Sequence, residues 1–329
     1  MLRISILFMT CLMSLRAEQQ VLLVLLKGAN ALGYYTLEGQ LQTAVSVGRH
    51  PHEMVLSPDG KYVYITDNGT MRIEHAGKGG NTVSVVDIAA RKRADTMSTG
   101  SHRRPHGISI DPRTWLLAVT TEAPDRLVLF DGRQRRYLRH FEVRGKTTHM
   151  VSLGPGKSGA EWAYVSNSGM DTVTAVQLTT GANKVIQAGD RPEGSVLSKD
   201  GKHLFVANRE AATVTIIDTE RHAAIGEIRT GKGPVRIGIT PDGKTLVYAL
   251  MHDRKIEFTD LDTRRPVAQV AVDGDPISIS VSADGKFAFA AAEEKDTVYV
   301  ISVPERKLVR QFQTAKGAGP DALLLVTLP

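Results

Sequence analysis

The chain has 329 residues, with 41 lysines and arginines against 35 aspartates and glutamates, and 42% of its residues are hydrophobic. This composition is typical of a globular protein, and the length would suffice for two ordinary domains. The single cysteine, Cys11, lies in an N-terminal segment that we expect to be removed, and its loss would exclude disulfides, thiolate zinc sites and covalently attached c-type haem.

The first 17 residues predict a signal peptide, because Arg3 precedes an apolar run over residues 4–15 and Ala17 offers the small residue that a signal peptidase needs. The mature chain, residues 18–329, should then begin near Glu18 and reside in the periplasm or outside the cell. The apolar run is too short to span a bilayer, so we expect no membrane span. A buried strand, or a lipoprotein anchor at Cys11, are the alternatives.

The next segment predicts three strands, over residues 21–26, 33–37 and 42–47, which correspond to the last three strands of a four-stranded unit. The opening strand of that unit is missing here, but residues 319–326 at the other end of the chain have the pattern of an opening strand and nothing more. We therefore expect the two ends to complete one sheet between them, which would leave no open edge in a ring of sheets.

The unit is clearest over residues 189–218, where short β-branched and aromatic runs alternate with turn residues. Asp200-Gly201 supplies the first turn, since glycine tolerates the positive φ that a tight reversal needs. The opening strand begins at a Gly-x-x-Pro motif, and the later openings recur about 42–44 residues apart, the period of a four-stranded blade. Seven openings are found, at positions 51, 105, 148, 192, 234, 276 and 320. One repeat domain of seven antiparallel, four-stranded blades is predicted, all-β in class.

The end of the second strand in each unit resembles the motif that names the YVTN family of seven-bladed β-propellers. It stands here as residues 64–67, 164–167 and 205–208, with third-strand companions at residues 81–87 and 296–301. The resemblance covers nearly all of the chain after its first twenty residues. It implies the propeller fold, and it leaves the function open, because such propellers include binding proteins, lactonase-like hydrolases and haem-carrying relatives.

One connection is much longer than its counterparts, namely residues 67–80 between the second and third strands of the first complete blade. Long loops on a rigid scaffold often carry function, and this one could bring His75 over the mouth of the channel. A tolerated insertion is the other interpretation.

Up-and-down topology predicts that the residues after the opening positions surround one mouth of the ring. In chain order these residues are His52, His106, His149, Glu193, Val235, Ile277 and Asp321. Three imidazoles and flanking carboxylates are ligands that Zn, Fe, Cu or Ni favour, so we expect a divalent transition metal held by His52, His106, His149, Glu193 and Asp321. A metal-free polar pocket and purely structural histidines remain open.

A second ring of polar residues is expected around the same mouth as contacts to a bound group. It comprises Asp67, Glu122, Asn167, Asn208, Arg209, His252 and Glu293, joined by His75 of the inserted loop. The favoured function is binding of a metal ion or a small polar or anionic ligand. Whether the site also catalyses a reaction stays open. A lactonase-like hydrolase or metal-dependent lyase would use Glu193 as base, with Arg209 or Arg236 orienting an anionic substrate.

A platform for protein docking is a third class, although the few aromatic residues of the chain disfavour it. The arginine-rich stretch over residues 91–146 predicts a solvated rim rather than a specific nucleic-acid site. We expect a monomer.

Overall fold

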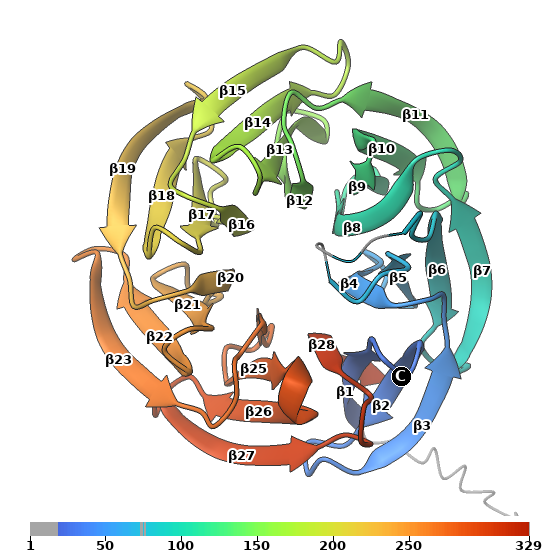
Figure 1. Ribbon diagram of the computed structural model, residues 1–329, viewed down its shortest axis with the longest axis vertical. Helices are drawn as coiled ribbons and strands as arrows, with labels where there is room; N and C mark the ends of the chain where they lie inside the picture. The colour runs from blue at the N-terminus through green and yellow to red at the C-terminus, as the bar shows by residue number, and fades with distance from the viewer. Residues whose placement is uncertain (1–18, 73–74, 76, 329) are drawn as a thin grey trace, which may run out of the picture.

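Twenty-eight strands form seven four-stranded antiparallel sheets arranged as a ring around a central channel (Figure 1). The structure is a computed structural model, and it describes residues 19–72, 75 and 77–328. The predicted signal segment lies outside the described residues. The prediction of a seven-bladed propeller with antiparallel, four-stranded blades is confirmed.

Blade 1 combines the two ends of the chain, and blades 2 to 7 follow in sequence order. The strands of blades 1 to 3 are β28 (Pro320–Leu328), β1 (Gln19–Leu26), β2 (Ala31–Tyr35) and β3 (Leu41–Ser46); β4 (Pro51–Leu56), β5 (Tyr62–Asp67), β6 (Thr82–Asp87) and β7 (Lys92–Ser98); β8 (Arg103–Ile110), β9 (Leu116–Ala123), β10 (Asp125–Asp131) and β11 (Arg136–Glu142).

The other four blades have the same order from the channel outward. Their strands are β12 (Thr148–Pro155), β13 (Ala160–Asn167), β14 (Thr172–Gln177) and β15 (Asn183–Gln187); β16 (Pro192–Leu197), β17 (His203–Asn208), β18 (Thr213–Asp218) and β19 (Ala223–Arg229); β20 (Pro234–Ile239), β21 (Thr245–Leu250), β22 (Lys255–Asp260) and β23 (Arg265–Ala271); β24 (Ser278–Val281), β25 (Phe287–Ala292), β26 (Thr297–Ser302) and β27 (Lys307–Gln313). A short 3-10 helix, η1 (Glu293–Lys295), follows β25.

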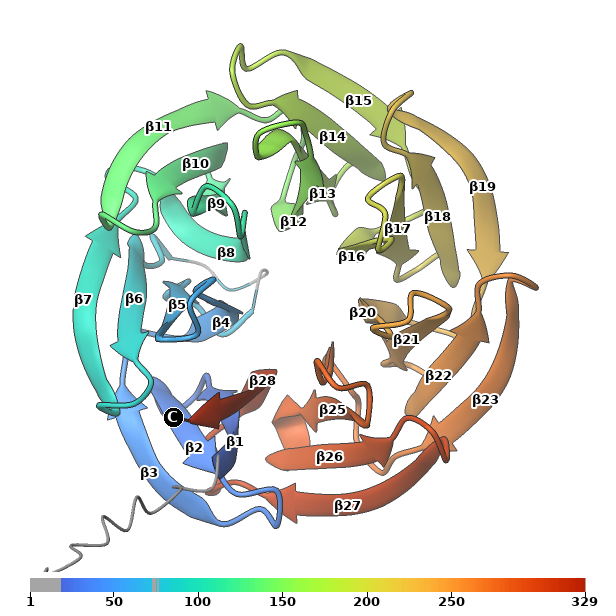
Figure 2. The ribbon, with the colours of Figure 1, turned by 180° about the vertical axis from the view of Figure 1, so that it is seen from behind.

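The ring closes through the pairing of β28 with β1, in which Val21 lies opposite Val326 and Leu23 opposite Leu324. The two strands lie side by side in both views of the ring (Figures 1 and 2). The predicted closure by the N- and C-terminal strands is therefore confirmed, and it removes the sheet edges that an open ring would expose.

The apolar core lies between neighbouring blades. Tyr64 and Val85 of blade 2, for example, pack in one cluster with Leu117 and Phe130 of blade 3. The innermost strands are half-buried around the channel, and the outermost strands, such as β7 and β11, are mostly exposed. Each blade therefore depends on its two neighbours for burial, which is the usual energetics of a repeat architecture.

Two kinds of loop define two mouths of the channel. The upper mouth carries the segments before each opening strand and the loops between second and third strands, and the lower mouth carries the Asp-Gly-Lys turns. At the lower mouth Gly201 has φ +71°, and the carboxylate of Asp200 accepts hydrogen bonds from the Ser198 hydroxyl and the Lys202 amide. The expected role of these turns as simple hairpin reversals is confirmed.

At the upper mouth the opening glycines make room for the last residue of the second strand. A Cβ atom on Gly48 or Gly189 would collide with the side chain of Asp67 or Asn208, respectively. This contact explains why the Gly-x-x-Pro motif and the YVTN-like motif recur together. In the part of the chain that the structure describes, no helix is long and apolar enough to cross a membrane.

Candidate functional site

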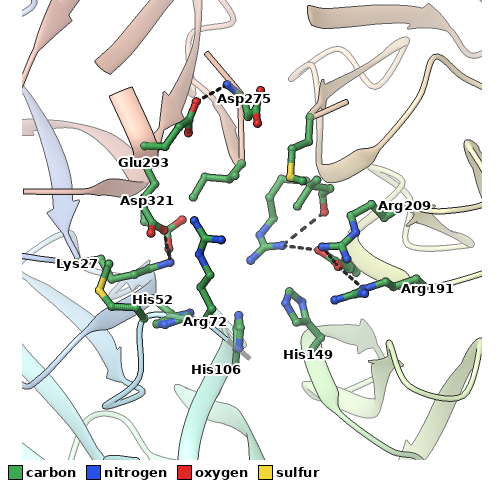
Figure 3. A pocket seen from close by; sticks show the side chains of 17 residues that line it. Lys27, His52, Arg72, His106, His149, Arg191, Arg209, Asp275, Glu293 and Asp321 are labelled. Carbon is green, nitrogen blue, oxygen red and sulfur yellow. Dashed lines mark hydrogen bonds and ion pairs between the residues drawn. The ribbon is translucent and has the colours of Figure 1, made fainter. Parts of the chain in front are cut away.

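All seven residues that follow the blade openings line one cavity at the upper mouth, with a volume of about 380 Å³. The cavity lies within the size range of small-molecule sites in proteins. His52, His106 and His149 point into it from neighbouring blades (Figure 3). Going on around the ring, Glu193, Val235 and Ile277 continue the wall, and Asp321 completes it beside His52.

The three imidazoles form an arc on β4, β8 and β12. The ring centroids of His52 and His106 are 4.7 Å apart, and those of His106 and His149 are 4.0 Å apart. Burial lowers the pKa of His52 and of His149 well below the ordinary value, and neighbouring positive groups lower both further. Both rings are therefore neutral at pH 7.

Two of the three rings have a hydrogen bond that fixes their orientation. His52 Nε2 donates to the carbonyl oxygen of Thr70 at 2.8 Å, and His106 Nδ1 donates to the Glu122 carboxylate at 2.6 Å. Two buried imidazole nitrogens, His106 Nε2 and His149 Nδ1, have no hydrogen-bond partner among the described residues. Buried polar atoms are nearly always satisfied in native proteins, so these two call for a missing partner.

Glu193 lies at the centre of a group of arginines. Its carboxylate is 2.9 Å from Arg209 Nη1, 3.4 Å from Arg191 Nε and 3.8 Å from Arg236 Nη1. Arg236 also binds Glu53 on the far side of the channel, with Nη2 2.6 Å from Glu53 Oε1. Burial opposes the charge of Arg236, but Glu53 and Glu193 outweigh it and raise the pKa of the guanidinium. The predicted catalytic trio Glu193, Arg209 and Arg236 thus forms one ion-pair network.

Lys27 organises the opposite wall. Its Nζ is 2.6 Å from Asp321 Oδ2 and 2.9 Å from Glu293 Oε2. Burial alone would lower the pKa of Lys27, but the two carboxylates reverse the shift and raise it. Asp321, expected as a metal ligand, is therefore engaged by a buried ammonium group.

Three residues of the expected second ring lie away from the cavity. Asp67 accepts hydrogen bonds from Thr82, Ser84 and the amide of Gly48. Asn167 and Asn208 donate to the equivalent third-strand hydroxyls of their own blades. Side chains alternate along a strand, so Asp67, Asn167 and Asn208 point toward the strands of their own blades and away from the channel. Their hydrogen bonds hold those strands together.

Of the other second-ring residues, Arg209 and Glu293 line the cavity, and Glu122, His75 and His252 lie outside its lining. Glu122 sits behind His106 and contacts Arg104, whose Nε is 3.2 Å from Glu122 Oε2. His75 lies in a smaller pocket formed by the inserted loop, and His252 lies beside Gly233. From that loop it is Met71 and Arg72, rather than His75, that reach the channel cavity.

The arrangement of donors does not form a complete metal site. Within residues 19–72, 75 and 77–328, no group of three or more His, Cys, Asp or Glu side chains could hold a metal ion. The physical reason is that His52 Nε2 is bound to Thr70, Asp321 to Lys27, and Glu193 to Arg209.

Some lining residues escaped the sequence analysis because they stand outside the post-proline positions. They are Lys27, Met71, Arg72, Arg191, Met251, Asp275 and Glu294. A signal existed for two of them, since Arg191 and Asp275 immediately precede Pro192 and Pro276. The residue before an opening proline therefore belongs to the mouth as much as the residue after it.

Comparison with known proteins identifies the type of propeller. A model of the cytochrome D1 heme domain family matches residues 189–322. The seven-bladed beta-propeller protein Rv1057 of Mycobacterium tuberculosis (strain ATCC 25618 / H37Rv) is 27% identical over 225 residues, covering 58% of this chain and 56% of that protein. The chain is a seven-bladed propeller, and residues 189–322 of it resemble the cytochrome D1 heme domain. It spans about half the length of this curated relative.

Solved structures share the propeller architecture of this chain at low sequence identity. A functionally unknown protein from Desulfotomaculum acetoxidans DSM 771 has a TM-score of 0.78 at 12% identity, covering 94% of this chain and 99% of that one. The Kuenenia stuttgartiensis hydrazine synthase chain gives 0.68 at 15% identity, covering 84% and 95%. The dihydro-heme d1 dehydrogenase NirN, solved in complex with DHE, gives 0.64 at 16% identity, covering 90% and 64%. These likenesses concern the fold.

The family match falls on one half of the cavity. Residues 189–322 include Glu193, the arginines around it and Asp321. His52, His106 and His149 lie outside the matched range. Any role for the imidazole arc must therefore be argued from this chain's own geometry.

Proposed function

We propose that this propeller binds a small charged ligand non-covalently in the cavity at its upper mouth. The observation that carries the proposal is the pair of buried imidazole nitrogens, His106 Nε2 and His149 Nδ1, which lack a partner among the described residues on the wall of a 380 Å³ cavity. A ligand, with or without bridging water, would supply the missing hydrogen bonds.

The test uses the full chain labelled with 15N at histidine. Native mass spectrometry of protein purified from its host shows whether a small molecule is carried along. Titration with succinate, glycine, glutamate and phosphate, followed by histidine nitrogen resonances and by calorimetry, then shows which chemistry is bound. Perturbation confined to His52, His106 and His149 supports the proposal.

Variants at the arc separate binding from folding. We expect His149→Leu to lose binding while keeping the melting temperature, because it replaces an imidazole that carries an unpartnered buried nitrogen by an apolar group. His106→Leu should also lose binding, but with a lower melting temperature, because Glu122 loses the hydrogen bond from His106 Nδ1. The matched control is His203→Leu at the lower mouth. Equal affinity in the arc variants and the control would contradict the proposal.

A metal-bearing ligand is a second candidate, favoured by the bond between His106 Nδ1 and Glu122. A carboxylate on one ring nitrogen fixes the tautomer so that the other nitrogen offers its lone pair, which is the usual arrangement around metal-ligating histidines. An iron tetrapyrrole, when bound, would supply the metal and would need only one or two such nitrogens. His106 would hold the metal, and Arg191 and Arg209 suit carboxylate groups at the rim.

Optical titration with haemin, and elemental analysis of protein prepared without a His-tag, test this candidate. The double variant H52A/H106A should lose the metal or the haem and keep its fold. A Zn, Fe, Cu or Ni ion held by the side chains alone stays a prediction. It requires His52 to release Thr70 and the carboxylates to release their cations.

Catalysis at the same mouth also stays a prediction. For a lactonase-like hydrolase or a lyase, Glu193 would act as base only after its carboxylate leaves Arg209. Loss of lactone hydrolysis in Glu193→Gln, with ligand affinity retained, would support it.

We further propose that the chain works in the periplasm or outside the cell, on the strength of the apolar segment over residues 4–15. Mass spectrometry of protein from its host should find an N-terminus near Glu18. Cytoplasmic protein with residues 1–17 intact would contradict export.

A further inference from the structure

The cavity has a negative wall and an arginine wall on different blades. The negative wall belongs to blades 7 and 1, and its carboxylates are those of Asp275, Glu293, Glu294 and Asp321. Lys27 neutralises part of this charge, and Arg254 binds Asp275 at 2.8 Å. Four carboxylates against two cations leave this wall negative.

The arginine wall belongs to blades 5 and 6, and Arg72 of the inserted loop lies apart from it, beside His52 and His106 (Figure 3). Arg191, Arg209 and Arg236 surround Glu193, and Glu53 and Glu210 are the other carboxylates in contact with them, so this wall is balanced in charge and offers a ligand guanidinium donors. Arg209 uses Nη1 for Glu193 and Nε for Glu210, and its Nη2 makes no hydrogen bond or ion pair with the described residues. A guanidinium has five donors in a fixed fork, so this group can still bind a carboxylate.

An apolar strip separates the two walls. In ring order Glu193 of blade 5 is followed by Val235 and Ile277, and then by Asp321. Met251 adds a third apolar side chain. In the close view Arg191 and Arg209 lie on one side of the cavity, and Asp275, Glu293 and Asp321 lie on the other (Figure 3). A ligand that reaches from one wall to the other must cross the apolar side chains with an apolar part of its own.

We propose that the ligand of this site is a zwitterion, an amino acid or related molecule whose ammonium and carboxylate groups are joined by a short aliphatic spacer. This proposal rests on the proposed function and gives it a ligand class. The carboxylate meets Arg209 and Arg191, the ammonium meets Glu294 and Asp275, and the spacer lies on Val235 and Ile277. A ligand with one charge would satisfy one wall and desolvate the other without compensation.

The test compares ligands that differ only in their charges and spacer. The probes are glycine, 3-aminopropanoate, 4-aminobutanoate and 5-aminopentanoate, with butanoate and butylamine as singly charged counterparts at constant ionic strength. Calorimetry gives affinity, and 15N resonances of the three histidines report occupancy. We expect one spacer length to bind at least tenfold more tightly than either singly charged probe.

Two conservative variants assign the ends of the ligand. Arg209→Gln should weaken the best zwitterion about tenfold and remove its advantage over butylamine, the loss expected for one charge-assisted hydrogen bond. Glu294→Gln keeps an acceptor for the Asp275 amide, which donates to Glu294 at 2.7 Å, and should remove the advantage over butanoate. Arg221→Gln at the lower mouth is the control with the same change of charge.

The outcomes distinguish failure of this inference from failure of the proposed function on which it rests. If butanoate binds as tightly as every zwitterion and moves the histidine resonances equally, the inference is overturned and the proposed function stands. If no probe moves those resonances and no molecule is carried through purification, the proposed function fails as well. A spacer-dependent preference for the zwitterions, lost in both variants, supports the inference.

Discussion

The two mouths of the propeller are built from the same repeat but satisfied in different ways. At the lower mouth each Asp-Gly-Lys turn is complete within five residues, as where Ser57 donates to Asp59 at 2.7 Å and Ser282 donates to Asp284 at 2.6 Å. At the upper mouth the contacts join residues far apart in the chain, such as Glu53 with Arg236 and Lys27 with Glu293. Local contacts repeat because each blade needs them, whereas contacts between blades differ from place to place.

The pKa values follow the same division. Hydrogen bonds from Ser198 and the Lys202 amide lower the pKa of Asp200 at the lower mouth. Burial raises the pKa of Asp67 at the upper mouth to about 6, although Thr82, Ser84 and Gly48 lower it in part. The charged groups of the lower turns are therefore stabilised by their own hydrogen bonds. The upper mouth holds buried charges that lower the folding stability, which is common at functional sites.

The largest effect is expected from loss of the closing strand. Deleting residues 320–329 removes β28, the partner of β1, together with Leu323 and Val326 from the core. We expect a lower and broader thermal transition, measured by circular dichroism, because blade 1 loses its inner strand. Deleting residue 329 alone is the control. An unchanged transition in the longer truncation would refute the closure as a source of cooperativity.

Loss of the Glu53–Arg236 ion pair across the channel should have the next largest effect on stability. Arg236→Met leaves Glu53 buried without its partner, which should cost about 3 kcal/mol in chemical denaturation. Adding Glu53→Gln should restore much of the loss. Equal stability of the single and double variants would show that the two distant blades are not coupled, and would weaken the contrast between the mouths.

The variant Asp67→Asn tests how much folding stability is lost by burying a carboxylate at the upper mouth. Asn167 and Asn208 stand at the same position in other blades and donate to the equivalent hydroxyls, so asparagine should fit. The pKa of Asp67 is about 6 against an ordinary 3.8, so the folded state holds this proton between those values when the unfolded state has lost it. Folding stability from this group is therefore greatest at low pH and falls as pH rises to about 6.

At pH 8 we expect Asp67→Asn to be more stable than the parent by about 3 kcal/mol, from a shift of about two pKa units. The difference should disappear as the pH falls towards 4. Denaturation curves at pH 4, 6 and 8 measure it, with Asn208→Asp as the converse variant. A constant difference across this range would mean that Asp67 does not titrate in the folded state as described.

The smallest effect is expected at the lower mouth. Asp200→Ala removes the acceptor for Ser198 and Lys202 and should cost about 1 kcal/mol, the usual net value of such hydrogen bonds. Ligand affinity and histidine resonances should not change. A loss of binding here would break the division between a structural mouth and a binding mouth.

Much of this molecule could be predicted from its sequence because the fold repeats. The spacing of Pro192, Pro234 and Pro276 fixed the blades, and topology then placed His52 and Glu193 at one mouth. The partners of these residues could not be predicted, because Lys27 meets Asp321 only once the ring has closed. The orientation of Asp67 was missed for a different reason: its neighbours on the strand have equal polarity, so the pattern did not show which face was which.

The Glu53–Arg236 pair has a consequence for the traffic of ligands. It joins β4 to β20, two inner strands that face each other across the channel, one residue deeper than His52 and Val235 (Figure 1). A solute that enters the cavity from the upper mouth meets this ion pair before it can go deeper into the channel. Any macromolecule that covers the upper mouth would slow arrival and departure by the same factor. Such a cover would lengthen the residence time of the ligand and leave its affinity unchanged.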